Sequence, residues 1–210
     1  PNTGVLTRTQ EDFYISYRDE NGKWSVAQNL GTPINTADNN EGAPSLSADG
    51  RFLFYAACAG YDGYGNGLQG FGACDIFFSQ KVNGAWSKPK NVGAPVNGTS
   101  WDSQPSFSSD GKTLYFVSHR KGGFGDSDIW MAVLGDDGKW GPAINLGTEI
   151  NTSGKEEAVF IHPDNQTLYY ASDGLTGMGG LDLFVCRRDT VTGKWGKPTN
   201  LGYPINTAGD

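Results

Sequence analysis

The chain has 210 residues, of which 31 are glycine and 19% are charged, and its formal net charge is −7. This negative charge argues against a nucleic-acid backbone or an anionic membrane surface as the partner. The 26 aromatic residues (6 Trp, 9 Tyr and 11 Phe) argue against disorder, and no apolar run approaches the ~20 residues of a transmembrane helix. We therefore expect a folded chain with no direct membrane insertion and no secretory or lipidation signal.

An internal repeat determines how the chain is divided. A tryptophan followed by an Asn-Leu-Gly or Asn-Val-Gly motif, and then by Ile-Asn or Val-Asn, occurs four times. The copies are roughly 55 residues apart, which is close to the length of a β-propeller blade. The predicted units are a partial blade at 1–36, full blades at 37–97, 98–151 and 152–206, and the start of another blade at 207–210.

Each full unit is predicted to contain four short strands. The partial unit lacks the first strand and supplies only the last strands of a blade. Gly or Asn closes the turn after each first strand, because both residues tolerate positive φ. The second strands are apolar on both faces and therefore need cover on both sides, which stacked blades provide. The predicted first strands are 43–47, 104–108 and 158–162, and the predicted second strands are 52–57, 113–118 and 167–172.

The third strand of each unit follows a glycine-rich loop and opens on an aspartate. A short turn, Asn-Gly or Asp-Gly in three units, then leads to the tryptophan and the fourth strand, and such dipeptides between strands indicate hairpins. Pro89, Pro142 and Pro198 place the fourth strand at a sheet edge, since proline cannot donate to a strand ladder. The sequence predicts an all-β propeller of four-stranded antiparallel blades. About three full blades plus a partial one are fewer than the ~4–8 blades of a ring, so we expect a piece of a longer protein.

Two stretches of this repeat resemble a known family. Pro105-Ser-Phe-Ser-Ser-Asp110-Gly111 and Gly122-Gly-Phe-Gly-Asp-Ser-Asp128 resemble the TolB-type, WD40-like propeller repeat. The motif Asn-Leu-Gly-x-x-Ile-Asn resembles one subfamily, found in periplasmic OmpA-family proteins of Bacteroidetes-type bacteria. There a helical-repeat segment precedes the propeller and a peptidoglycan-binding domain follows it, and some members serve type IX secretion or gliding. This sequence departs from the pattern at Val159, where the other first strands have proline.

The resemblance implies a non-catalytic periplasmic scaffold associated with the outer membrane. Its implied partners are other periplasmic or outer-membrane proteins, and peptidoglycan is expected to bind only through a domain absent from this chain. The family assigns no catalytic residue and no cofactor. The alternative is a propeller that binds or processes glycans, which would require paired carboxylates and aromatic side chains in one cleft.

Two sets of repeated acids are candidate sites. One acid opens every third strand, and a short carboxylate there can accept backbone N–H bonds and fix the preceding loop, although a metal site is the alternative. Glu41, Asp102 and Glu156 precede the first strands and would lie around the propeller axis. A ring of these carboxylates could bind a cation or a cationic side chain, whereas hydrogen bonds to a neighbouring blade would make them structural. The acids of the first set are Asp12, Asp75, Asp128 and Asp182.

The loop between Cys58 and Cys74 is longer than its counterparts and carries the aromatic residues Tyr61, Tyr64 and Phe71. These aromatics either form a binding surface or pack onto the propeller. The two cysteines lie at the facing ends of adjacent strands, so a disulfide is geometrically reasonable, and it would indicate an oxidising compartment.

Three other groups complete the set of candidates. Trp101 breaks the repeat beside Asp102 and is a candidate for a ligand surface. Cys186 is expected to be a buried thiol because it lies in an apolar strand. The repeated tryptophans Trp24, Trp86, Trp140 and Trp195 are expected to serve packing.

Overall fold

A computed structural model describes residues 11–36, 40–60, 63–64 and 67–209. Within these ranges every regular element is a β-strand, and the paired strands are antiparallel. No helix long and apolar enough to cross a membrane occurs among the described residues. This architecture confirms the predicted all-β fold class.

The strands form one two-stranded sheet, here called the partial blade, and three larger sheets, here called the first, second and third full blades. The partial blade contains β1 (Tyr14–Ile15) and β2 (Gln28–Asn29). The first full blade contains β3 (Glu41–Leu46), β4 (Phe52–Cys58) and β5 (Cys74–Val82), with β6 (Ala85–Trp86) and β7 (Lys90–Asn91) both paired to β5. The second contains β8 (Asp102–Phe107), β9 (Thr113–Ser118), β10 (Asp128–Val133) and β11 (Ile144–Asn145). The third contains β12 (Glu156–Ile161), β13 (Thr167–Ser172), β14 (Asp182–Arg187) and β15 (Thr199–Asn200).

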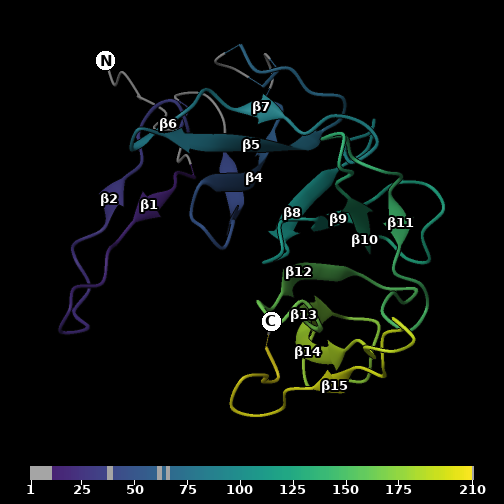
Figure 1. Cartoon of the computed structure of the whole chain (residues 1–210). Helices are drawn as coiled ribbons and strands as arrows, with labels where there is room; N and C mark the ends of the chain where they lie inside the picture. The colour runs from purple at the N-terminus through teal and green to yellow at the C-terminus, as the bar shows by residue number, and fades with distance from the viewer. Residues whose placement is uncertain (1–10, 37–39, 61–62, 65–66, 210) are drawn as a thin grey trace, which may run out of the picture.

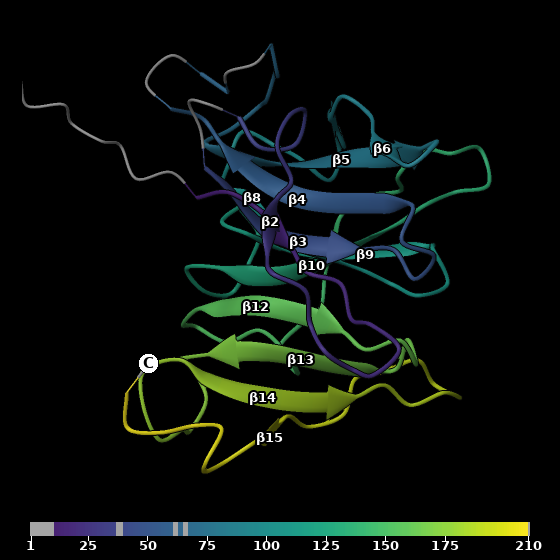
Figure 2. The same ribbon diagram turned by 90° about the vertical axis from the view of Figure 1, so that its left-hand side faces the viewer.

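The four units follow one another along an arc, with the partial blade at one end and the third full blade at the other (Figures 1 and 2). The first strands begin two residues earlier than predicted, so the acids Glu41, Asp102 and Glu156 are part of them. The outer strands β7, β11 and β15 are only two residues long. A proline just before or within the outer segment of each full blade limits its ladder, because proline has no N–H to donate.

Each inner strand has the same irregularity. The pairing of β3, β8 and β12 with its neighbour shifts register in mid-strand. The residue at the shift has positive φ: 54° at Ala43, 50° at Gln104 and 52° at Ala158. Side chains then connect successive inner strands, because Ser45 Oγ accepts the Phe107 N–H at 3.0 Å and Ser106 Oγ accepts the Ile161 N–H at 2.9 Å. The serines of the first strands therefore join neighbouring blades.

Apolar side chains fill the spaces between blades. Tyr55 and Phe77 pack toward the partial blade, whereas Phe54 and Ile76 pack toward the second full blade. Tyr115 and Ile129 of the second full blade belong to a further cluster with Tyr170 and Phe184 of the third. The central strands of the first and second full blades are thus covered on both faces, as their continuous apolar sequence predicts. The repeated tryptophans occupy equivalent positions opposite the ends of the third strands, through bridges or strand pairs between Arg18 and Trp24, Lys81 and Trp86, Leu134 and Trp140, and Arg188 and Trp195.

The exposed fraction of a repeated side chain depends on whether another blade lies next to it in the arc. Ile34, Val96 and Ile150, which lie in the motif after Asn-Leu-Gly or Asn-Val-Gly, are 0%, 0% and 1% exposed. The equivalent Ile205 is 58% exposed because it lies on the third full blade, which no later described blade covers. Trp24 of the partial blade is likewise 62% exposed.

Candidate functional site

The acid that opens each third strand holds the loop before it. Asp128 is 1% exposed, and its carboxylate accepts the N–H groups of Phe124 at 2.6 Å and Gly125 at 3.0 Å. The amide of Asn145 donates to the same carboxylate at 2.7 Å. Asn151 in turn donates to Asn145 at 2.8 Å and exchanges two hydrogen bonds with the backbone of Ile129. We call this Asp–Asn–Asn network the clasp.

The clasp recurs around the arc and explains why the Asn-Leu-Gly-x-x-Ile-Asn motif is repeated. Its members are Asp12, Asn29 and Asn35; Asp75, Asn91 and Asn97; Asp128, Asn145 and Asn151; and Asp182, Asn200 and Asn206. These acids satisfy backbone and amide donors, which supports their predicted structural role. Among the described residues, no group of three His, Cys, Asp or Glu side chains could hold a metal ion.

Each clasp in the full blades presents one exposed apolar side chain. Phe71, Phe124 and Met178 occupy the same position before the clasp aspartate, and the N–H of each donates to that aspartate. Their exposed fractions are 55%, 50% and 50%. The loops that carry them lie on the side of the arc where the third strands begin, which is the left-hand side of Figure 2. We call Phe71, Phe124 and Met178 the apolar row and this side the loop face.

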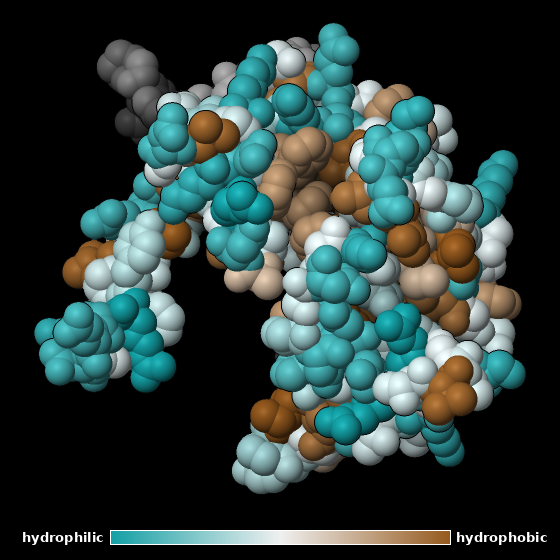
Figure 3. Space-filling view, in the orientation of Figure 1, coloured by the Kyte–Doolittle hydropathy of each residue, from teal (hydrophilic) through white to brown (hydrophobic). Residues whose placement is uncertain are grey.

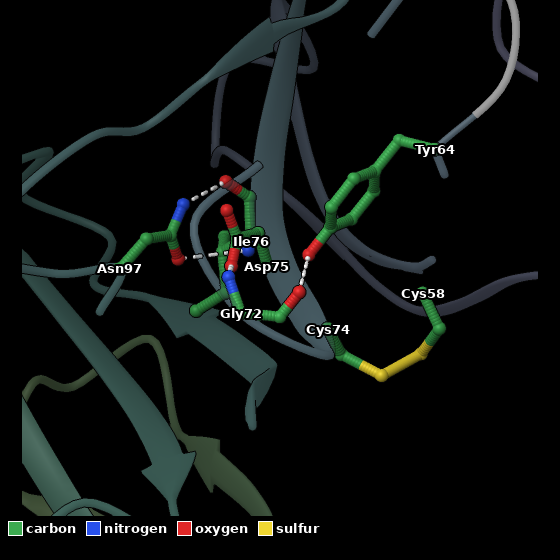
Figure 4. Close-up of a disulfide and its surroundings, with 7 residues drawn as sticks. All are labelled: Cys58, Tyr64, Gly72, Cys74, Asp75, Ile76 and Asn97. Carbon is green, nitrogen blue, oxygen red and sulfur yellow. Dashed lines mark hydrogen bonds between the residues drawn. A yellow bond between two sulfur atoms is a disulfide. The ribbon is translucent and has the colours of Figure 1, made fainter. Parts of the chain in front are cut away.

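The long loop of the first full blade is fixed at both ends. Cys58 and Cys74 face each other across β4 and β5 and form a disulfide with an S–S distance of 1.98 Å. Tyr64 is only 7% exposed, and its hydroxyl donates to the carbonyl of Gly72 at 2.8 Å (Figure 4). Its ring lies 5.6 Å from that of Phe77. Tyr64 therefore anchors the loop to the blade, which leaves Phe71 as its exposed aromatic, whereas Tyr61 lies outside the described residues.

Trp101 lies beside this loop. It forms a bridge with Cys74, and the preceding Ser100 accepts the N–H of Ala73 at 3.2 Å. The Trp101 ring is half-buried and stacks on His119, with ring centroids 4.6 Å apart. The long loop of the first full blade therefore contacts the residues directly before β8, the first strand of the second full blade. Trp101 lies on the loop face with Phe71.

The acids of the inner strands are buried. Glu41, Asp102 and Glu156 are 2%, 0% and 0% exposed. Asp102 accepts the Gly98 N–H at 2.7 Å, the Ser118 hydroxyl at 2.5 Å and the Arg120 guanidinium at 2.6 Å. Asp102 is therefore hydrogen-bonded to residues of its own blade.

Both glutamates accept a threonine hydroxyl, but Glu41 Oε2 is buried without a hydrogen-bond partner among the described residues, whereas both oxygens of Glu156 accept bonds. Glu156 accepts the N–H and hydroxyl of Thr152 at 2.8 and 2.7 Å and the Ser172 hydroxyl at 2.8 Å, while Glu41 accepts the Thr36 hydroxyl at 2.5 Å. Burial raises the pKa of both carboxyl groups above the ordinary value of 4.5. The structure places the acids in separate blades and, in the described part of the chain, assembles no three-acid cation site from them. Most of their hydrogen-bond partners lie in the same blade. Hydrogen bonds to a neighbouring blade are the structural alternative that the sequence suggests.

Phe124 and Met178 are not among the candidates that the sequence singles out. The repeat register contained the signal, because both residues align with Phe71 when the clasp aspartates are superposed. A glycine-rich loop, however, lacks the regular alternation of buried and exposed residues that a strand has. Only the structure therefore shows that these apolar side chains are exposed to solvent.

No protein-family model matches the sequence, and no curated protein is significantly similar to it. Solved structures with similar folds include TolB from Acinetobacter baumannii, with a TM-score of 0.52 and 15% identity over 92% of this chain and 38% of that one. A putative TolB from Agrobacterium tumefaciens has a TM-score of 0.52 and 17% identity over 93% of this chain and 64% of that one. A puromycin-hydrolysing peptidase from Mycobacterium tuberculosis has a TM-score of 0.50 and 17% identity over 90% and 30%.

This chain spans less than two thirds of the length of each of these proteins. At these identities the likeness concerns the fold alone. It confirms that the chain folds as part of a TolB-like β-propeller.

Proposed function

We propose that this chain is a non-catalytic protein-interaction module of the periplasm and that a protein partner binds its loop face. The observation that carries the proposal is the apolar row. Three side chains at equivalent positions of three consecutive blades are each at least half exposed, while the residues beside them hold the backbone in place.

The geometry of the row suits a protein interface. Aromatic and methionine side chains are enriched in interfaces, and a few anchors supply most of the binding energy. The clasp fixes the backbone N–H of each anchor before any partner arrives, so little conformational entropy remains to be lost on binding. Trp101 and the disulfide loop extend the same surface at the first full blade.

The disulfide supports the proposed compartment. Such bonds persist in oxidising compartments, and the periplasm is one of them. The resemblance of the repeat to OmpA-family propellers supports a finer proposal, in which the partners are other periplasmic or outer-membrane proteins, including those of secretion or gliding complexes. Outer-membrane association and peptidoglycan binding would then depend on a domain outside this chain.

Glycan processing has less support. It needs accessible paired carboxylates, but Glu41, Asp102 and Glu156 are buried, accept hydrogen bonds and lie in separate blades.

Site-specific crosslinking tests the proposal. A photoreactive amino acid replaces Phe124 on the loop face or, as a control, Val191, which is 92% exposed on a turn at the opposite ends of the strands. In native cells we expect discrete protein adducts from position 124 and not from position 191, and we expect Phe71→Ser together with Met178→Ser to weaken them. Equal labelling from both positions, or saturable glycan binding abolished by Trp101→Ala, would overturn the proposal.

A further inference from the structure

A second surface lies on the opposite side of the blades, between the first and second full blades. There a cleft of about 730 Å³ is bounded by the turn after β3, the turn after β8 and the segment that ends at Trp140. In Figure 3 apolar side chains gather in a hollow between the surfaces over β5 and β8. This volume is within the range of ligand sites, which is roughly 300–1,000 Å³.

The walls of the cleft are aromatic. Trp140 lies edge-on to Phe107, with ring centroids 6.3 Å apart. Phe107 is 4.6 Å from Phe54, which is 5.9 Å from Phe78. The four rings form a continuous series, and Phe54 is buried whereas the other three are half-buried. Rings in this arrangement offer both faces and edges to a further ring.

At the equivalent place between the second and third full blades, hydrogen bonds join the two turns. The N–H of Ser109 donates to the Asn165 side chain at 2.9 Å, and the Ser109 hydroxyl donates to the carbonyl of Pro163 at 2.6 Å. Arg188 lies over Trp195, with its guanidinium carbon 5.6 Å from the ring centroid.

The residues that close the second interface are replaced in the first. Ala48 stands where the second interface has Ser109, Gly111 where it has Asn165, and Leu134 where it has Arg188. Alanine has no side-chain donor and glycine no side-chain acceptor, so these two turns cannot make the connecting side-chain bonds. The first interface thus lacks the side-chain bonds and the guanidinium found at the second, and the cleft lies there.

The mouth of the cleft has balanced charge. Asp49 pairs with Arg51 at 2.6 Å, and Asp110 and Lys139 also line the rim. A site for a charged small molecule would collect charges of one sign, whereas two acids and two bases suit the neutral, dipolar backbone of a peptide.

We propose that this cleft binds an aromatic side chain of a polypeptide partner, with the ring packed against Phe107 and Trp140 and the peptide backbone at the charged rim. The site is separate from the loop face, so it stands or falls independently of the function proposed above.

The proposal is tested with variants that introduce into the cleft the side chains found between the second and third full blades. The variant Ala48→Ser/Gly111→Asn recreates the Ser109–Asn165 connection. Gly111 has a φ of +71° and open space where a Cβ would lie, and its counterpart Asn165 has a φ of 56°, so asparagine is compatible with this backbone. Leu134→Arg is a second variant, in which a guanidinium would cover Trp140. Gly193→Asn is the matched control, because it makes the same change at a glycine with a φ of +70° and open space, on a turn of the third full blade outside the cleft lining.

The probes are the capped peptides acetyl-Gly-Trp-Gly-amide and acetyl-Gly-Glu-Gly-amide and free indole, and binding is measured by saturation-transfer NMR. We expect the tryptophan peptide to bind the native chain and the Gly193→Asn variant equally. We expect at least about tenfold weaker binding, equal to about 1.4 kcal/mol, by either cleft variant with an unchanged or higher melting temperature. Undiminished binding by the folded cleft variants would overturn the proposal. Binding of the glutamate peptide as tight as that of the tryptophan peptide, or of indole tighter than the tryptophan peptide, would also overturn it.

Discussion

Replacing Asp128 by Asn changes one atom type in a buried clasp. The native carboxylate accepts three hydrogen bonds, from the N–H groups of Phe124 and Gly125 and from the Asn145 amide. Asparagine keeps one acceptor oxygen and turns the other into an NH₂ group, which then faces at least one of these donors. The variant therefore loses one or two bonds to a charged acceptor and leaves the corresponding donors buried.

The cost follows from the number of bonds. A hydrogen bond to a charged group contributes about 1.5–3 kcal/mol, so the loss of one or two bonds should lower the free energy of unfolding by about 1.5–6 kcal/mol. Because a chain of this size loses about 2–4 °C per kcal/mol, the melting temperature should fall by roughly 3–24 °C.

Urea unfolding followed by tryptophan fluorescence measures this change, with a constant slope indicating that the folded and unfolded states are otherwise comparable. Asp126→Asn is the matched control, because Asp126 is exposed two residues earlier and the change removes the same charge. If Asp128→Asn and Asp126→Asn unfold within about 0.5 kcal/mol of each other, the clasp does not stabilise the blade as argued.

Three further predictions concern the cysteines and a buried acid. Reducing the Cys58–Cys74 bond, which spans 16 positions, should lower the free energy of unfolding by about 3 kcal/mol, and an unchanged urea midpoint after reduction would contradict this. Burial raises the pKa of Cys186 to about 12, so a thiol reagent at neutral pH should add mass only after urea is present, and rapid native labelling would refute its burial. Burial also raises the folded-state pKa of Glu156 above 4.5, so its stabilising contribution is full below that pH and is lost as the pH rises through the folded value. Glu156→Gln should therefore flatten the decline in stability above pH 4.5, and an unaltered pH profile would exclude this linkage.

The blade architecture could be predicted from local patterns. Tight turns, two-sided apolar strands and proline in the outer segments depend on residues close together in sequence, and each pattern was repeated often enough to be recognised. The repeat also indicated that the clasp acids were structural, because one acid at every strand start is better explained by a recurring loop than by a single site. The facing positions of Cys58 and Cys74 followed from strand pairing in the same way.

The functional surfaces depended on contacts that the repeat alone does not specify. Tyr64 and Phe71 are both aromatic residues of one glycine-rich loop, but only the fold shows that the first is buried against Phe77 and the second is exposed. The inner-strand acids share a sequence position, yet their partners differ from blade to blade.

The cleft beside Trp140 lies at the junction of two blades, where Ala48 and Gly111 have no hydrogen-bonding side-chain group to join the two turns. The repeating unit can be derived from the order of residues, because local hydrogen bonding and strand periodicity act within each blade. What the unit presents to a partner depends on the packed fold, because exposure and cavity shape are set by the side chains that the neighbouring blade brings to the same space.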